Sequence, residues 1–255
     1  MDIFFPTQTL PLFQVFAPCF TAPSFAYFQS SVWALMVVEG RKGMTRIARC
    51  VFFHQRALSS WERFLAEHRW SLATVTARLV RLVVAQLGTQ LQVHGASLLG
   101  KETTLVAKTA TRMVGGQKWK DHSDHADRGA YLVGHHWNLV GLLSPWGTRW
   151  LCWPLVMRLV PGLQGARQWL VGATAEPMSC WDAAMAASLE VTGCLGDAAA
   201  RVVADAYYSK APLLNGLRAR GIDVISRRRK DAVGWDDPAP HVHQAKHTQE
   251  APMAL

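Results

Sequence analysis

The segment of residues 202–208 constrains the fold of this chain more than any other. Its sequence, Val-Val-Ala-Asp-Ala-Tyr-Tyr, predicts a β-branched strand that ends at Asp205. A carboxylate at the tip of a buried strand is costly unless a positive charge meets it, and a divalent cation held by oxygen ligands is the common solution. Such a cation needs a second acid. The upstream stretch that best supplies one is residues 98–109, Leu-Leu-Gly-Lys-Glu-Thr-Thr-Leu-Val-Ala-Lys-Thr, which contains Glu102.

These two segments resemble motifs of one protein family. Residues 98–109 resemble the first-acid motif of bacterial insertion-sequence transposases of the Asp-Asp-Glu (DDE) type, and residues 202–208 resemble their second-acid motif. Three further stretches resemble family motifs: Gly-His-His-Trp at 134–137, Trp-Pro-Leu at 153–155 and Ser-Arg-Arg-Arg-Lys-Asp-Ala at 226–232. The order and spacing agree over roughly residues 30 to 235.

The resemblance implies a ribonuclease-H-like α/β domain with a mixed sheet, acting on double-stranded DNA with Mg²⁺ or Mn²⁺. Carried over to this sequence, the catalytic residues and metal ligands are Glu102 and Asp205. In that fold the first and fourth strands lie side by side, so acids at their ends converge. Transposases of this type cut DNA and join the freed end by in-line displacement at phosphorus, which two metal ions assist.

Two departures from the family pattern bear on activity. Glu102 stands where the family has Asp, and displacing a ligand by about an ångström can cost about 100-fold in rate. The family's third acid has no clear counterpart, because the downstream acids do not take its position: Asp231, Asp236, Asp237 and Glu250. We therefore expect a C-terminally truncated, incomplete catalytic domain that cleaves DNA poorly. The alternatives are a non-catalytic DNA-binding or regulatory remnant, and a fragment that does not fold stably.

Composition and charge agree with a folded DNA-binding protein. The 255 residues are 50% hydrophobic, enough for a packed core. The net charge of +9 suits a polyanionic partner, although a merely basic protein would show the same charge.

Other sequence features concern the compartment and the excluded classes. The five scattered cysteines favour reduced thiols in the cytoplasm. The apolar stretch 132–163 contains Arg149 and Arg158, which favours core strands over a membrane span. No Gly-x-Ser-x-Gly, Walker or dinucleotide motif is present.

Hydrophobic periodicity predicts three regions: a helical N-terminal domain over 1–90, the truncated catalytic domain over 91–235, and a disordered tail over 236–255. Residues 1–29 should be irregular because of their prolines, and the predicted helices begin near Ser31, Thr45, Trp61 and Leu72. The predicted elements of the second region are strands 91–99, 131–143 and 149–159, a helix from Ser179 to Gly193, strand 201–205, helix 212–220 and strand 222–226. In the resemblance, the His- and Asp-rich stretch 118–136 is a loop that leads into the second strand.

Basic residues are candidates for contact with DNA phosphates, with a solvated protein surface as the alternative. They are Arg41, Lys42, Arg46 and Arg49 near the first helix break, Lys108 in the first-acid motif, and Arg227, Arg228, Arg229 and Lys230 after the last strand. A homodimer is a further expectation.

Overall fold

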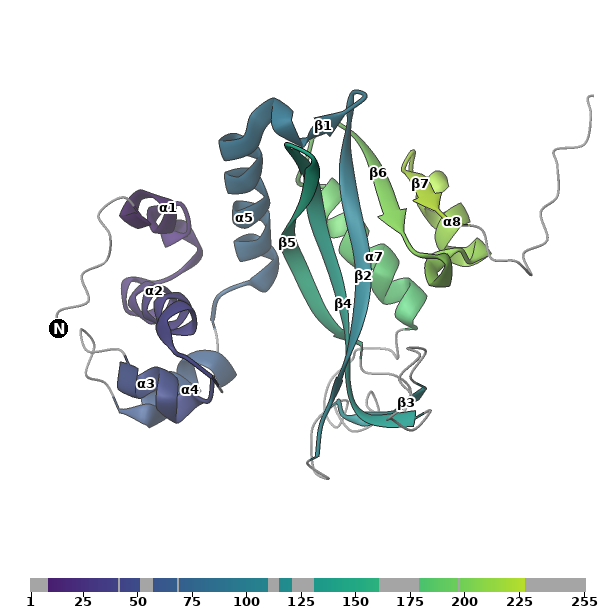
Figure 1. Ribbon diagram of the computed structural model, residues 1–255. Helices are drawn as coiled ribbons and strands as arrows, with labels where there is room; N and C mark the ends of the chain where they lie inside the picture. Colours follow the sequence, from purple (N-terminus) through teal and green to yellow (C-terminus); the bar gives the residue numbers. More distant parts are fainter. Residues whose placement is uncertain are drawn as a thin grey trace, which may run out of the picture.

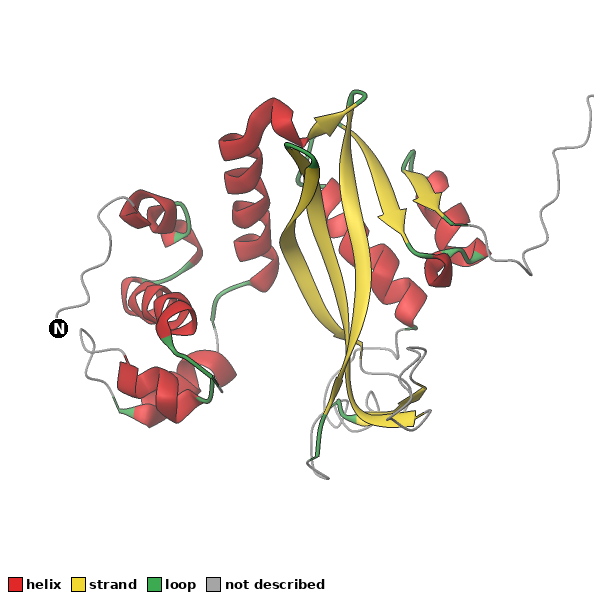
Figure 2. Cartoon of the chain, viewed as in Figure 1, coloured by secondary structure: helices red, strands yellow, loops and turns green. Residues whose placement is uncertain are grey.

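The fold is taken from a computed structural model that describes residues 9–40, 42–50, 57–67, 69–109, 115–120, 131–160, 179–196 and 198–227. Helices come first along the chain, and a single mixed sheet with further helices follows (Figures 1 and 2). The predicted fold class, a ribonuclease-H-like mixed sheet preceded by a helical region, is confirmed.

The N-terminal elements are α1 (Leu10–Gln14), η2 (Ala17–Cys19), α2 (Ala22–Val37), α3 (Met44–Cys50), α4 (Leu58–Ala66), α5 (Leu72–Leu87) and η3 (Gly88–Leu91). The expectation of an irregular segment up to residue 29 is therefore wrong from residue 10 onward. The prolines that suggested it lie in the first turns of α1, η2 and α2. Proline is favoured there because its fixed φ suits a helix and its missing N–H would be unpaired in any case.

The early helices and α5 belong to different hydrophobic cores. Tyr27, Ile47 and Trp61 are buried together, and the Tyr27 and Trp61 rings meet edge to face at 5.0 Å. By contrast, Val80 of α5 is buried in the core of the sheet. The predicted helix start near Leu72 is confirmed, and the Ser71 hydroxyl caps it by accepting a hydrogen bond from Thr74 N at 3.3 Å.

By length and composition alone, the helical stretch Leu72–Leu91 could cross a membrane. Such a stretch is weak support for a membrane span, because core helices of soluble proteins pass the same test. Here α5 packs through Val80, Leu79 and Val83 against the sheet.

The second part of the chain contains β1 (Gln92–Val93), β2 (Ala96–Ala107), β3 (Gln117–Lys120), β4 (Tyr131–Trp146), β5 (Arg149–Val160), α7 (Cys180–Thr192), β6 (Ala199–Ala204), η4 (Ala206–Tyr208), α8 (Ala211–Arg218) and β7 (Asp223–Ser226). Strands β2, β4 and β5 are antiparallel neighbours, while β6 pairs parallel to β2 and β7 parallel to β6. Three antiparallel strands followed by two parallel ones are the order expected of a ribonuclease-H-like sheet. Strand β3 was not predicted: it overlaps the start of the expected loop and pairs with the start of β4.

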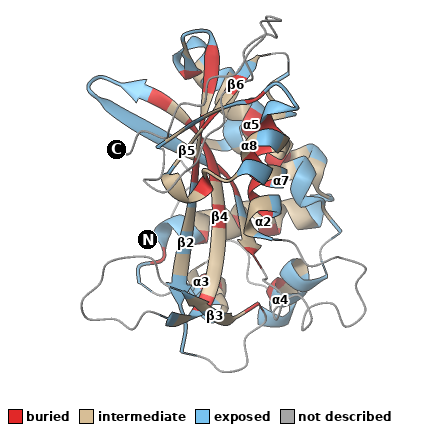
Figure 3. Ribbon diagram, turned by 90° about the vertical axis from the view of Figure 1, so that its right-hand side faces the viewer, coloured by how far each residue is buried: buried red, intermediate tan, exposed pale blue. Residues whose placement is uncertain are grey.

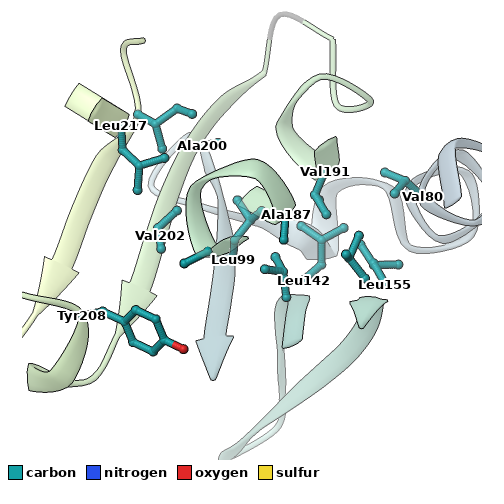
Figure 4. Close-up of a cluster of buried hydrophobic side chains, with 14 of the residues drawn as sticks. Val80, Leu99, Leu142, Leu155, Ala187, Val191, Ala200, Val202, Tyr208 and Leu217 are labelled. Carbon is teal, nitrogen blue, oxygen red and sulfur yellow. The ribbon is translucent and has the colours of Figure 1, made fainter. Parts of the chain in front are cut away.

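Strand alternation divides the sheet into two faces. One, which we call the covered face, carries Leu99, Leu142 and Val202 and packs against α5, α7 and α8 (Figure 4). Buried residues gather along these central strands and α7 (Figure 3). The other, which we call the open face, carries Met157 and Ile225, whose side chains are 51% and 50% exposed.

Candidate active site

Asp205 directly follows β6 and remains in extended conformation, with φ −75° and ψ 175°. Its carboxylate oxygen Oδ1 accepts a hydrogen bond from the Tyr207 backbone N–H at 3.1 Å, which caps the short helix η4. Its carbonyl oxygen accepts a hydrogen bond from the Ser226 hydroxyl at 2.8 Å, which ties the end of β6 to β7. The Asp205 side chain is exposed. Hydrogen bonds nevertheless fix both its carboxylate and its backbone carbonyl group.

Glu102 lies inside β2 rather than at its end, since β2 continues to Ala107. The expectation that both acids lie at strand ends is thus wrong for Glu102. Its side chain is exposed, and Oε1 accepts a hydrogen bond from the Thr103 backbone N–H at 2.9 Å. The sequence predicted that this strand ends at residue 99. Residues 101–104, Lys-Glu-Thr-Thr, are polar and show no apolar strand pattern, although β2 continues through them.

The fold brings Glu102 and Asp205 together. Strands β2 and β6 are parallel neighbours, and Lys101 of β2 pairs with Ala204 of β6. Glu102 and Asp205 are the next residues along these two chain segments. Neighbouring strands lie about 4.8 Å apart. Both side chains turn to the open face, because Lys101 and Ala204 turn to the covered face. Both acids line one cavity of about 260 Å³, whose other lining residues are Gly100, Lys101, Leu139, Cys152, Val203 and Ala204.

Lys101, which no sequence motif predicted as a site residue, lies behind this cavity. Lys101 is only 4% exposed, and its Nζ lies 5.2 Å from the centre of the Tyr208 ring. Burial lowers the pKa of Lys101 to about 7, although Glu102 and Cys180 act to raise it. Its position two residues after Leu99 puts it on the same side of β2, but strand alternation does not tell which side of the sheet is covered.

The wall behind Asp205 is aromatic. The Trp181 and Tyr207 ring centres lie 4.7 Å apart with the ring planes tilted by 37°, and Cys180 Sγ lies 3.5 Å from the Tyr207 hydroxyl. Burial raises the pKa of Tyr207, as do its hydrogen bond with Cys180 and the nearby charges. The Ser179 hydroxyl caps α7 together with Asp182 in a complete capping box, as the sequence predicted for the helix start. This packing supports the chain segment that carries Asp205.

The two carboxylates suit a hard divalent cation such as Mg²⁺ or Mn²⁺, because such ions take oxygen ligands. One oxygen of each, Glu102 Oε1 and Asp205 Oδ1, accepts a backbone hydrogen bond. The second oxygen of each has no hydrogen-bond partner among the described residues and would be available to an ion. Within the same part of the chain, no group of three or more His, Cys, Asp or Glu side chains is placed to hold a metal.

The predicted DNA-binding residues differ in their surroundings. Lys42 Nζ donates hydrogen bonds to two carbonyl oxygens, that of Leu35 and that of Val38, the latter at 3.1 Å. Arg46 Nη1 donates to the carbonyl oxygen of Glu39 at 3.2 Å. Both cations thus bind the carboxyl end of α2. All members of the predicted set that the structure describes are exposed: Lys42, Arg46, Arg49, Lys108 and Arg227. Arg41 and residues 228–230 lie outside the described part of the chain.

Comparison with known proteins identifies the family. The family model described as DDE superfamily endonuclease matches residues 15–252. Solved structures similar to this chain include a cryo-EM structure of the piggyBac transposase synaptic complex with hairpin DNA (11% identity, TM-score 0.37, 84% of this chain and 45% of that chain) and a Mos1 transposase paired-end complex with the left transposon end (8% identity, TM-score 0.25, 78% of this chain and 57% of that chain). The chain thus spans about half the length of each. A search of curated proteins finds no match. Because the family model covers most of the sequence, this chain belongs to the DDE superfamily endonucleases.

Proposed function

We propose that this protein binds double-stranded DNA and carries out metal-dependent DNA cleavage and strand transfer in transposition. The observation that carries the proposal is the placement of Glu102 and Asp205 on adjacent strands, lining one cavity. Family membership supplies the reaction class, since transposases and their DDE endonuclease domains act on DNA.

In this proposal the residues of the chain bind and orient, and a metal would supply Lewis-acid chemistry. Glu102 and Asp205 would hold Mg²⁺ or Mn²⁺, whose charge would favour attack on the phosphorus of the scissile phosphate. The Tyr207 N–H orients the Asp205 carboxylate, and the Ser226 hydroxyl anchors its backbone. Such support matters because ligands must be held within a fraction of an ångström of a productive arrangement.

We further propose that cleavage by this 255-residue chain is weak. Among the described residues only two carboxylates line the cavity, and the glutamate is one methylene longer than the family's aspartate. The low ligand count favours the second candidate function, a non-catalytic DNA-binding or regulatory protein. The free thiols of all five cysteines support a reducing, cytoplasmic compartment. A homodimer remains part of the proposal.

The decisive experiment measures nicking of a supercoiled plasmid that carries the DNA flanking the gene, with Mg²⁺ or Mn²⁺ present. We expect slow nicking by the unmodified chain, loss of nicking in Asp205→Asn and Glu102→Gln, and no change in Glu67→Gln. Glu67 is a matched control because it is exposed and lies in the N-terminal helical part. If the unmodified chain binds the plasmid but neither metal supports any nicking, the non-catalytic function is correct instead.

A further inference from the structure

The central strands extend well beyond the candidate active site. β2 runs five residues past Glu102, and β4 begins at Tyr131, well before Leu139, the residue that pairs with Glu102. β3 pairs with this early part of β4, so three strands lie side by side at the end of the sheet far from β1 (Figure 1). We call residues 103–108, 117–120 and 131–138 the β-arm.

Three exposed lysines lie on the β-arm. The Lys108 backbone N–H donates to the Val133 carbonyl at 2.9 Å, and Lys118 pairs with Val133 from the opposite side. These two lysines therefore flank one residue of β4, with Cα atoms about 10 Å apart across two strand spacings. Lys120 pairs with Tyr131 further along. Residues 103–108, 117–120 and 131–138 contain no acidic residue.

The lysines share the open face with the carboxylates. Side chains on β2 alternate, so Glu102, residues 104 and 106, and Lys108 point to one face of the twisted ladder. Cross-strand partners share a face, which places Lys118 with Val133 and Lys120 with Tyr131 on that side as well. At about 3.3 Å per residue, Lys108 lies roughly 20 Å along the strand from Glu102.

Tyr131 adds an aromatic surface to the row of lysines. Its side chain is 56% exposed, and Lys118 Nζ lies 5.1 Å from the centre of its ring. An exposed tyrosine beside an ammonium group offers both an apolar contact to a sugar and a hydroxyl donor to a phosphate. The exposed surface is thus positive and carries a hydrogen-bonding group beside Lys118 and Lys120.

We propose that Lys108, Lys118 and Lys120 of the β-arm bind the backbone of duplex DNA that flanks the scissile phosphate. The inference rests on the proposed function, which brings the scissile phosphate to Glu102 and Asp205. Two carboxylates repel the DNA backbone, so a positive row on the same face is needed to hold the duplex. A separation of roughly 20 Å corresponds to about six base pairs at 3.4 Å per pair. Lysine ammonium groups bind phosphates as point charges, without reading base sequence.

The test compares two double variants of the full chain in EDTA, so that binding is separated from cleavage. The first variant, Lys118→Gln with Lys120→Gln, removes two charges from the β-arm. The control variant, Arg81→Gln with Arg218→Gln, removes two charges from helices α5 and α8, which pack on the covered face. The probe is a 30-base-pair duplex with the flanking sequence, and affinity is measured over a range of salt concentrations. Each lost phosphate contact lowers the slope of log affinity against log salt by about 0.9, so the β-arm variant should lose about 1.8. The control variant should keep the slope of the unmodified protein.

A second measurement tests the position of the DNA. A photo-crosslinking amino acid at position 131 should attach to the duplex about eight base pairs from the nicked phosphate, because Tyr131 lies eight residues along β4 from Leu139. The segment 121–130, outside the described residues, contains Asp121, Asp124 and Asp127. If these acids already neutralise the lysines, both double variants will have the slope of the unmodified protein.

The outcomes separate this inference from the proposed function. Equal slopes in all three proteins, or crosslinks scattered over the whole duplex, would overturn the β-arm site and leave the cleavage proposal standing. Nicking that depends on Asp205 would still support that proposal. Failure of the unmodified chain to bind any duplex would overturn both.

Discussion

Lys101 and Tyr208 form a buried cation–aromatic pair, with Lys101 Nζ 5.2 Å from the centre of the Tyr208 ring. Both side chains are almost fully buried, and the pair lies directly behind the cavity that Glu102 and Asp205 line. The ring attracts a cation, but burial dominates and lowers the pKa of Lys101 to about 7. A charged Lys101 therefore costs folding free energy, and this cost depends on pH.

We predict that Lys101→Met stabilises the protein most below pH 7. The pKa of Lys101 is about 7 in the folded protein and 10.5 in the unfolded chain. Between these values the unfolded chain binds a proton that the folded protein has lost, so the unmodified protein gains stability as pH rises. The advantage of the variant should shrink from about pH 7 to pH 9.5. Higher pH is unsuitable, because Tyr207 and Tyr208 have raised pKa values and reduce stability above their ordinary value of 10.

Denaturant unfolding of both proteins across this pH range measures the difference. Other titrating groups are common to the two proteins and cancel when the unfolding free energies are subtracted. An advantage of Lys101→Met that is constant with pH would show that Lys101 is not buried in its charged form.

We predict that Glu102 and Asp205 together bind Mn²⁺ in the absence of DNA. Asp205→Asn and Glu102→Gln should each weaken Mn²⁺ binding about tenfold or more, since each removes a charged oxygen ligand. The double variant should be little worse than either single one, because the two acids act as a unit. Glu102→Asp should change little on its own. Electron paramagnetic resonance of free Mn²⁺ gives the affinity, and unchanged binding in Asp205→Asn would place the ion elsewhere.

We predict that Gly141→Ala destabilises the sheet next to the cavity. A Cβ at position 141 would lie 2.7 Å from Cys152 Sγ and 2.7 Å from the Trp153 carbonyl oxygen. Because a backbone atom is one of the two, the β4–β5 pairing must shift, at a cost of about 1–3 kcal/mol. Gly43→Ala is the control, since nothing lies within 4 Å of its added carbon. Equal unfolding free energies for the two variants would contradict the close strand approach at Gly141.

We predict that Ser179→Ala lowers the melting temperature by about 2–4 °C. The Ser179 hydroxyl accepts a hydrogen bond from Asp182 N at 3.1 Å at the start of α7, and losing such a cap costs about 1 kcal/mol. The control is Ser59→Ala, an exposed position inside α4 where alanine favours the helix. Calorimetry measures the melting temperatures of both variants. A lower melting temperature in Ser59→Ala alone would contradict the capping role of Ser179.

We predict that Lys42 and Arg46 act on stability rather than on DNA binding. Their side chains bind the carbonyl oxygens at the end of α2, so Lys42→Gln and Arg46→Gln should lower the melting temperature and leave the salt dependence of DNA binding unchanged. Arg49→Gln is the comparison, because Arg49 is exposed at the end of α3. If Arg49 contacts a phosphate, its loss lowers the salt slope by about 0.9 without affecting stability. Salt slopes that fall equally in all three variants would support the original expectation of a DNA-binding cluster.

Local sequence signals predicted most elements of the sheet domain. Alternating apolar residues predicted β4 and β5, the β-branched run predicted β6, and Ser179 predicted the start of α7. The same local rules failed at the N-terminus, where proline begins helices instead of interrupting them. They also failed at β3, whose four residues, Gln-Lys-Trp-Lys, have almost no apolar pattern and become a strand only by pairing with β4.

The sequence by itself determined that this chain has two acidic motifs in the order of the DDE family, separated by two predicted strands and a helix. Only the tertiary structure decided that Glu102 and Asp205 meet, because the parallel pairing of β2 with β6 joins segments about 100 residues apart. It also decided that Lys101 is buried while its neighbour Glu102 is exposed, since alternate residues of a strand face opposite sides of the sheet. Which side is covered depends on where α7 packs, and no local pattern around residue 101 contains that information.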